Sequence, residues 1–148
     1  MKKIVMSAAL GMVVFSACSQ NIPVKDVPSV VLNSFNSAYN NVAGVEWEKI
    51  NDLYEADFDV NKVDHAVLLN ASGAIVMRKQ DADERKLPAA LTSAIASKFP
   101  KYKIDDAELV ERNGKKYYQL ELEGKGLSDQ KVLMTEGGVA FKGFEFWD

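Results

Sequence analysis

The 148-residue sequence contains a single cysteine and a single histidine. One cysteine excludes a disulfide-stapled scaffold and a cysteine-based zinc site, and one histidine excludes zinc sites with several histidine ligands. Positive charge is not in excess either. The formal net charge is −3, the wrong sign for nucleic acid or an anionic membrane surface. Low-complexity bias is absent and 47% of residues are hydrophobic, so we expect a folded domain without cofactor or nucleic-acid partner.

The longest uncharged hydrophobic run lies at the N-terminus. Lys2 and Lys3 precede residues 4–15, a stretch too short to span a membrane but suited to an export signal. The tetrapeptide Phe15-Ser16-Ala17-Cys18 resembles a bacterial lipobox. This pattern predicts a signal peptide over 1–17, with Cys18 as the acylated mature N-terminus; cleavage just after Ser19 stays open as an alternative. We expect an exported protein of the periplasm or outer membrane, in contact with the membrane only through this lipid anchor.

Two segments 60 residues apart share one hydrophobic pattern. Each opens on a hydrophobic residue followed by proline and repeats a hydrophobic residue every four positions: Val27, Val31, Phe35 and Tyr39, then Leu87, Leu91, Ile95 and Phe99. This spacing predicts two amphipathic helices, ending at Asn40-Asn41 and before Pro100. Strand patterns follow each helix, at 45–50, 53–60, 63–70 and 74–79, then at 104–112, 115–123, 129–135 and 139–147.

Short connections between these strands, such as Asn113-Gly114, predict antiparallel hairpins. We therefore expect an α+β fold of two tandem α-β-β-β-β repeats, forming an antiparallel sheet with the helices packed on one face. The expected divisions are a tether over 18–25, a first repeat over 26–79, a joint over 80–86 and a second repeat over 87–148.

Strict alternation in two of the strands separates a hydrophobic face from a polar one. Tyr54, Ala56 and Phe58 point toward the helices, and acidic or amide residues point away. The candidate partner-binding face consists of Glu55, Asp57, Asp59, Gln119, Glu121 and Glu123. Carboxylates on one surface favour a partner with a basic surface. The alternative is a solvated sheet face that only keeps the protein soluble.

Catalytic and metal-binding patterns are weak. His65 lies next to Asp64, but adjacent strand residues point to opposite faces, and no Gly-x-Ser-x-Gly elbow is present. Asp57-x-Asp59-x-Asn61 resembles the start of a calcium loop, but the required glycine and final glutamate are missing. We predict no catalytic residue and no metal ligand. Trp147 and its neighbouring phenylalanines are expected to be buried, with an exposed interface anchor as the alternative.

Several short motifs are similar to those of PepSY-like proteins, which are exported proteins of Gram-negative bacteria. The similarity rests on Leu87-Pro88-Ala89-Ala90, Lys98-Phe99-Pro100 and Val132-Leu133-Met134 before Gly137-Gly138 in the second half, and on Val45-Glu46-Trp47, Tyr54-Glu55-Ala56-Asp57-Phe58 and Ala66-Val67-Leu68-Leu69 before Ser72-Gly73 in the first. Ser72 and Gly137 stand where members of the family commonly carry aspartate. The resemblance implies tandem repeats with the fold of beta-lactamase-inhibitor protein, and a non-enzymatic role.

The function expected from these observations is that of a non-catalytic, exported cell-envelope binding module. It is inhibitor-like and contacts another envelope or secreted protein through its polar sheet face. The alternative is a periplasmic carrier that binds a small ligand or a cation in the cleft between the repeats. An open polar sheet would favour the first hypothesis, and a large hydrophobic pocket would favour the second.

Overall fold

The computed structural model describes residues 19–148, so the expected signal peptide and Cys18 lie outside the described residues. Eight antiparallel strands form one sheet whose spatial order is the chain order. They are β1 (Ser19–Asn21), β2 (Glu46–Ile50), β3 (Leu53–Val60), β4 (Val63–Asn70), β5 (Ile75–Asp81), β6 (Lys103–Arg112), β7 (Lys115–Glu123) and β8 (Gln130–Thr135). The helices are α1 (Ser29–Ala38) and α2 (Ala89–Lys98), each preceded by a 3-10 turn, η1 (Val24–Asp26) and η2 (Glu84–Lys86). The architecture is α+β.

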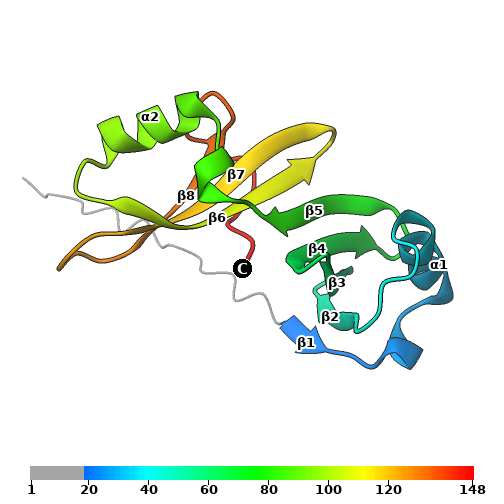
Figure 1. The fold of residues 1–148 in the computed structure, drawn as a ribbon. Coiled ribbons are helices and arrows are strands. Elements are labelled where there is room, and N and C mark those ends of the chain that lie inside the picture. The colour runs from blue at the N-terminus through cyan, green and yellow to red at the C-terminus, as the bar shows by residue number, and fades with distance from the viewer. Residues whose placement is uncertain (1–18) are drawn as a thin grey trace, which may run out of the picture.

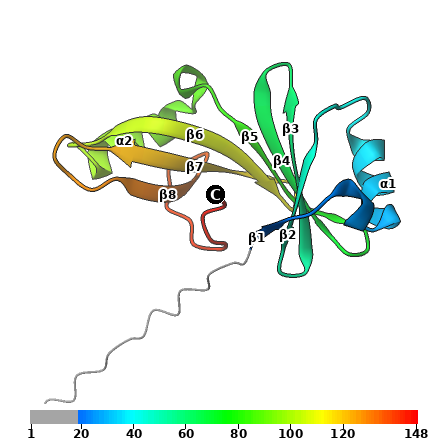
Figure 2. The ribbon, with the colours of Figure 1, turned by 90° about the horizontal axis from the view of Figure 1, so that it is seen from below.

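Both helices pack on the same face of this sheet, as predicted. The strand pairing runs from Phe58 under α1 through His65, Gln80 and Leu109 to Tyr118 under α2. Directly paired residues lie on one face, so α1 and α2 cover opposite ends of that face. Figures 1 and 2 show the sheet twisting between these ends, with α1 beside the early strands and α2 beside the later ones.

Each helix closes its own hydrophobic core. Val31 and Phe35 of α1 are buried against Trp47, Phe58 and Leu69 of the sheet. The equivalent positions of α2 are Leu91 and Ile95, which pack with Tyr118, Leu120, Leu122 and Met134. The predicted four-residue stripes therefore mark the buried faces of both helices.

A third hydrophobic cluster lies on the opposite face, at the centre of the sheet. Its buried members are Ala66, Leu68, Met77, Val110 and Trp147. The first four are strand residues, whereas Trp147 comes from the last residues of the chain, which cross this face (Figure 2). The centre of the sheet is therefore covered on the face away from the helices, whereas the helices cover the two ends of the other face.

Two glycines make equivalent contacts with the two helices. A Cβ atom on Gly73 would lie 2.9 Å from the carbonyl oxygen of Val30, and one on Gly138 would lie 2.6 Å from that of Ala90. Both glycines have positive φ, 83° and 75°. Val30 and Ala90 are again 60 residues apart. At each place a tight turn after a strand rests directly on the first turns of a helix, which only glycine permits.

The predicted strand over 139–147 is wrong. After Gly138 the chain makes one bridge, between Met134 and Ala140, and a last bond from Phe141 N–H to the Leu133 carbonyl. It then leaves the edge of β8, because its aromatic residues have packing partners on the face away from α2; Phe141, for example, lies 4.3 Å from the ring of Tyr117. Alternating aromatic residues indicate an extended chain but do not by themselves provide a strand partner.

The expected tether over 18–25 also differs from the structure. Residues 19–21 form β1, which pairs with β2, and Val24–Asp26 form η1. Pairing with β2 satisfies backbone groups that would otherwise be exposed at the sheet edge. Among residues 19–148, no helix is long and hydrophobic enough to cross a membrane.

Candidate functional site

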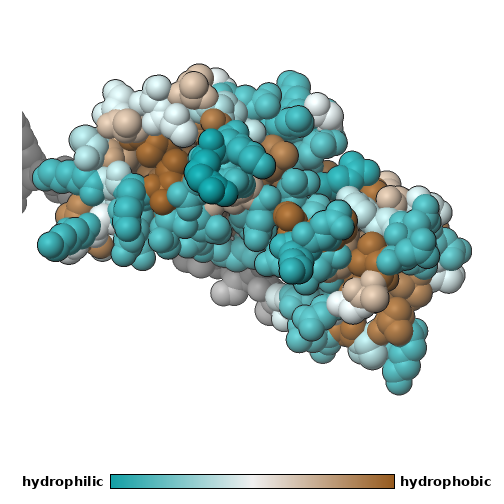
Figure 3. Space-filling model, viewed as in Figure 1, coloured by the Kyte–Doolittle hydropathy of each residue, from teal (hydrophilic) through white to brown (hydrophobic). Residues whose placement is uncertain are grey.

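The six residues of the predicted polar face do not form one open surface. All belong to β3 and β7, on the face away from the helices, but they lie in three different environments. Glu55 and Gln119 are buried, Asp57 and Asp59 line a groove, and Glu121 and Glu123 form ion pairs near β8 and the start of β6. Figure 3 shows hydrophilic residues over most of the visible surface, with hydrophobic residues emerging mainly beside the two helices.

Glu55 and Gln119 were expected to be solvated, and this is wrong: they are only 4% and 1% exposed. The indole Nε1–H of Trp147 donates to Glu55 Oε1 at 3.0 Å. The Gln119 side chain accepts a hydrogen bond from Trp147 N–H and donates one to the Trp147 carbonyl, both at 2.8 Å. Trp147 therefore covers the middle of the predicted face and joins β3 to β7. Its predicted burial is confirmed, with 7% of its surface exposed.

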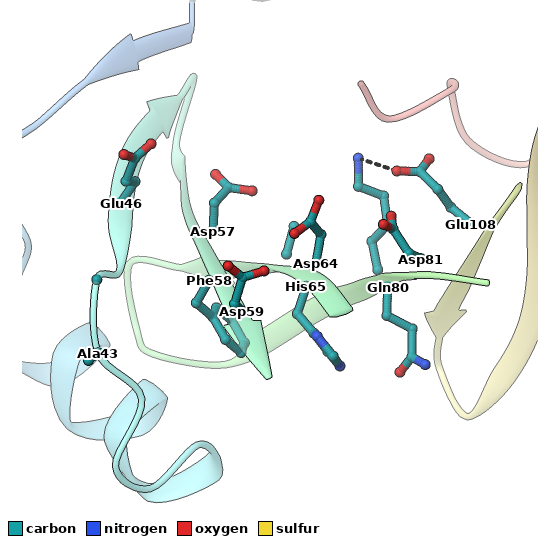
Figure 4. A pocket seen from close by; sticks show the side chains of 13 residues that line it. Ala43, Glu46, Asp57, Phe58, Asp59, Asp64, His65, Gln80, Asp81 and Glu108 are labelled. Carbon is teal, nitrogen blue, oxygen red and sulfur yellow. Dashed lines mark ion pairs between the residues drawn. The ribbon is translucent and has the colours of Figure 1, made fainter. Parts of the chain in front are cut away.

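Beside Trp147 lies an acidic groove with a cavity volume of about 460 Å³. Its charged lining residues are Glu46, Asp57, Asp59, Asp64, Lys79, Asp81 and Glu108. In Figure 4 the side chains of Asp57, Asp64 and Asp81 point to one side of the strands, while Phe58, His65 and Gln80 point to the other. Strand alternation on β3, β4 and β5 thus brings carboxylates from three strands together.

Carboxylate crowding and burial raise several pKa values in this region. Burial raises the pKa of Asp57 to about 6, and the nearby Glu48 carboxylate adds to the effect. The pKa of Asp59 is raised by a hydrogen bond to Asp64, its direct cross-strand neighbour, and by the charge of that residue. Burial also raises the pKa of Asp81. The raised pKa values indicate that the groove carboxylates repel one another when they are ionised.

Lys79 is the one lysine or arginine among the described groove residues, and its ammonium group is already engaged. It lies 3.1 Å from Glu108 Oε1 and donates to the Trp147 carbonyl at 2.9 Å. A single, internally paired lysine leaves most of the groove's carboxylates without a cationic partner in the groove. The arrangement can attract a cationic group, and it offers no nucleophile paired with a base.

His65 is accounted for by local contacts. Its Nδ1 bonds the Val63 carbonyl oxygen at 2.8 Å, and its ring stacks on Phe58 with 5.6 Å between centroids. Asp64 points away from the imidazole (Figure 4). Within residues 19–148, no group of three or more histidine, cysteine, aspartate or glutamate side chains is arranged to hold a metal ion. Asp57 and Asp59 of the calcium-like run line the acidic groove, whereas Asn61 follows β3 and is not a groove residue.

Three groove residues, Asp64, Asp81 and Glu108, were not assigned to the polar face from the sequence. Asp81 was expected in the joint over 80–86, whereas β5 extends through it, and the strands of Asp64 and Glu108 do not alternate strictly enough to fix the face of each residue. Pairing of Asp59 with Asp64 and of Asp81 with Glu108 places them with the predicted carboxylates. A register argument across β3 to β6 would have identified them.

Comparisons with known proteins show the fold. No family model matches the chain, and no curated protein matches its sequence. Among solved structures, a protein of Bacteroides eggerthii described as periplasmic aligns with a TM-score of 0.73 and 22% identity, over 78% of this chain and 86% of that one. A DUF2874 family protein of Bacteroides uniformis aligns with a TM-score of 0.72, 22% identity and the same two coverages.

A BLIP-like protein of Bacteroides fragilis is also similar, with a TM-score of 0.67 and 18% identity over 82% of this chain and 85% of that one. The chain therefore has a BLIP-like fold, in agreement with the fold implied by the resemblance. These identities are too low to carry function from one protein to another.

Proposed function

We propose that this chain is a non-catalytic periplasmic binding module whose acidic groove receives a basic segment of a partner protein. The observation that carries this proposal is the groove itself, in which carboxylates of β2 to β6 surround one cavity and the single lysine is internally paired. A lysine or arginine side chain of a partner would relieve the repulsion between Asp59 and Asp64. We include in this proposal the inhibitor-like role that was expected from the sequence.

The raised pKa of Asp57, about 6, gives this binding a defined pH dependence. A cationic partner interacts best with ionised carboxylates, so binding is expected to weaken as the pH falls below about 6. By linkage, the bound partner would lower the pKa of Asp57 and release protons. Attraction between opposite charges mainly raises the association rate, and added salt reduces it.

The test uses a lysine- and arginine-rich peptide and, in parallel, crosslinking capture from envelope extracts to identify the natural partner. Asp57→Asn combined with Asp64→Asn should slow association of the basic peptide and flatten its salt dependence. Glu123→Gln is the matched control, because it also removes a carboxylate from the predicted face but lies outside the groove. Equal association rates for both variants and wild type at low salt would contradict the proposal.

We also propose export with a lipid anchor on Cys18. The lipobox-like tetrapeptide supports this, as does the description of one structural neighbour as periplasmic. Cys18→Ala should move the protein from the membrane fraction to the soluble periplasmic fraction and abolish labelling by radioactive palmitate. A wild-type protein that is already fully soluble would rule out the anchor.

Tandem duplication is the origin that we propose for the fold, in line with the PepSY-like resemblance. Three offsets of 60 residues support it: the 3-10 turns, the α-helices and the helix positions that contact Gly73 and Gly138. The proposed repeats differ after their third strand, because β5 pairs with β6 whereas the chain after β8 leaves the sheet.

A further inference from the structure

The buried indole of Trp147 occupies a socket lined by both hydrophobic and polar side chains. Glu55 accepts the indole N–H, and the Lys79 ammonium lies 5.1 Å from the ring centroid. Val110 and Leu68 belong to the hydrophobic cluster around the ring. The socket therefore combines a hydrophobic floor with one acceptor and one cation, both suited to tryptophan.

Gln119 contacts the backbone of the same residue rather than its side chain. Its Oε1 accepts from Trp147 N–H and its Nε2 donates to the Trp147 carbonyl, each at 2.8 Å. These are the two bonds that a neighbouring β-strand would make to an extended residue. Because Gln119 is 1% exposed and also bonds Glu108 at 2.8 Å, its amide is held in place for this contact.

The residues on either side of Trp147 are also contacted by cations. Lys131 forms an ion pair with Asp148 and lies 4.8 Å from the ring centroid of Phe146. Arg112 donates to the Gly143 carbonyl at 3.3 Å and lies 5.6 Å from the Phe144 ring. The sheet face thus contacts a segment in which tryptophan stands between an aromatic and an acidic residue.

This C-terminal segment, residues 142–148, is not part of the sheet. No backbone-to-backbone hydrogen bond joins it to the remainder of residues 19–148; the last such bond is made by Phe141. All eight strands are paired without it. Its release would therefore leave the sheet ladder intact, which is what distinguishes a bound segment from a strand.

We propose that the Trp147 socket is a peptide-binding site, specific for an extended segment with tryptophan between an aromatic residue and a carboxylate, and that the chain's own C-terminal segment occupies it in cis. This site adjoins the proposed acidic groove and shares Lys79 and Glu108 with it. An external segment of the same chemistry competes with residues 142–148, so the occupied site is self-inhibited.

The test uses a fluorescent synthetic peptide of residues 142–148 and the full chain carrying Trp147→Ala, which empties the indole position. The variant should bind the peptide saturably and at least tenfold more tightly than the wild-type chain. A control peptide with alanine in place of Trp147 should bind at least tenfold more weakly. A folded variant that binds both peptides equally, or neither, overturns the proposal. Adding Asp57→Asn to the Trp147→Ala chain should leave the affinity for this peptide unchanged, which distinguishes the socket from the acidic groove.

Hydrogen exchange on the unmodified protein provides a second test, which stands even if Trp147→Ala fails to fold. The amide of Trp147 should exchange at least tenfold faster than that of Leu120, because the C-terminal segment opens while β7 stays paired. Equal exchange rates for the two amides would show that the segment leaves only on global unfolding, and would overturn the proposal.

Discussion

The two helix-covered ends of the sheet have the same backbone plan but different core side chains. Under α1, the ring of Phe35 meets those of Trp47 and Phe58 edge-on, with centroids 5.3 and 5.1 Å away. Under α2, the equivalent position is Ile95, and its neighbours Leu120 and Leu122 are aliphatic. The comparison shows that the four-residue stripe determines which face of each helix packs on the sheet, while the types of side chain that fill each core can vary.

The two edges differ more than the two cores. At the α1 end the chain before the first helix adds β1 to the sheet, whereas at the α2 end the chain after β8 crosses to the other face. The crossing segment covers Glu55 and Gln119 and leaves Asp57 and Asp59 in the open groove. The position of the C-terminus therefore decides which part of the polar face remains accessible.

Truncation of the two central helix residues should give the largest effects and test the comparison of the cores. Phe35→Ala removes a buried ring from an aromatic cluster and should lower the free energy of unfolding by about 4 kcal/mol. Ile95→Ala should cost about 3 kcal/mol, because fewer atoms are removed. Urea denaturation measures both. A larger loss from Ile95→Ala than from Phe35→Ala would show that the aromatic core tolerates a cavity better.

Glu55 links the α1 end to the C-terminal segment, and its ionisation should dominate the pH dependence of stability. Burial raises the pKa of Glu55 from its ordinary 4.5 to about 7. The folded state therefore binds a proton more tightly than the unfolded state, so stability falls as the pH rises from about 5 to about 7. The loss corresponds to about 3 kcal/mol.

Glu55→Gln tests this prediction, because it keeps an acceptor for the indole N–H without the charge. The variant should match wild type at pH 5 and exceed it at pH 8, where its curve is flatter; urea unfolding at several pH values gives both. Asp57, with its pKa of about 6, should contribute a smaller fall of the same sign. Wild-type stability that rises between pH 5 and 8 would contradict the assignment.

Glu55 also shows where sequence reasoning reaches its limit. Strand alternation placed Glu55 correctly on the face away from the helices. The hydrophobic stripes identified the helices, and the Asn113-Gly114 turn, with φ of 53° and 71°, identified a hairpin. These are local signals, carried within a few residues. The cover over Glu55 comes from Trp147, 92 positions later, and no local periodicity encodes such a contact. The acidic groove depends in the same way on the pairing of separate strands.

The glycines under the two helices test how equivalent the ends are. Gly138→Ala should cost about 2 kcal/mol, since its Cβ would lie 2.6 Å from both the Ala90 carbonyl and the Ala94 Cβ. Gly73→Ala should cost less, because its nearest contact is the Ser34 hydroxyl, which can rotate away, and its backbone contact with the Val30 carbonyl is longer, at 2.9 Å. Gly114→Ala is the control, having a positive φ of 71° but open space, and should cost about 1 kcal/mol. Thermal unfolding ranks the three, and equal losses would mean that helix contact adds nothing.

The smallest effect is expected at Glu123, which shares a predicted face with Asp57 but lies at the α2 end. Its carboxylate pairs with Lys103 at 3.2 Å, and the two side chains are 51% and 76% exposed. Such pairs contribute between about 0 and 1 kcal/mol, so Glu123→Gln should change the free energy of unfolding by less than about 0.5 kcal/mol.

Asp57→Asn should instead stabilise the protein above pH 6, because it removes a half-buried charge that its neighbours repel. Urea unfolding at pH 7.5 separates the two variants. If Glu123→Gln stabilised the protein as much as Asp57→Asn, carboxylate repulsion would extend over the whole face and would not be concentrated in the groove.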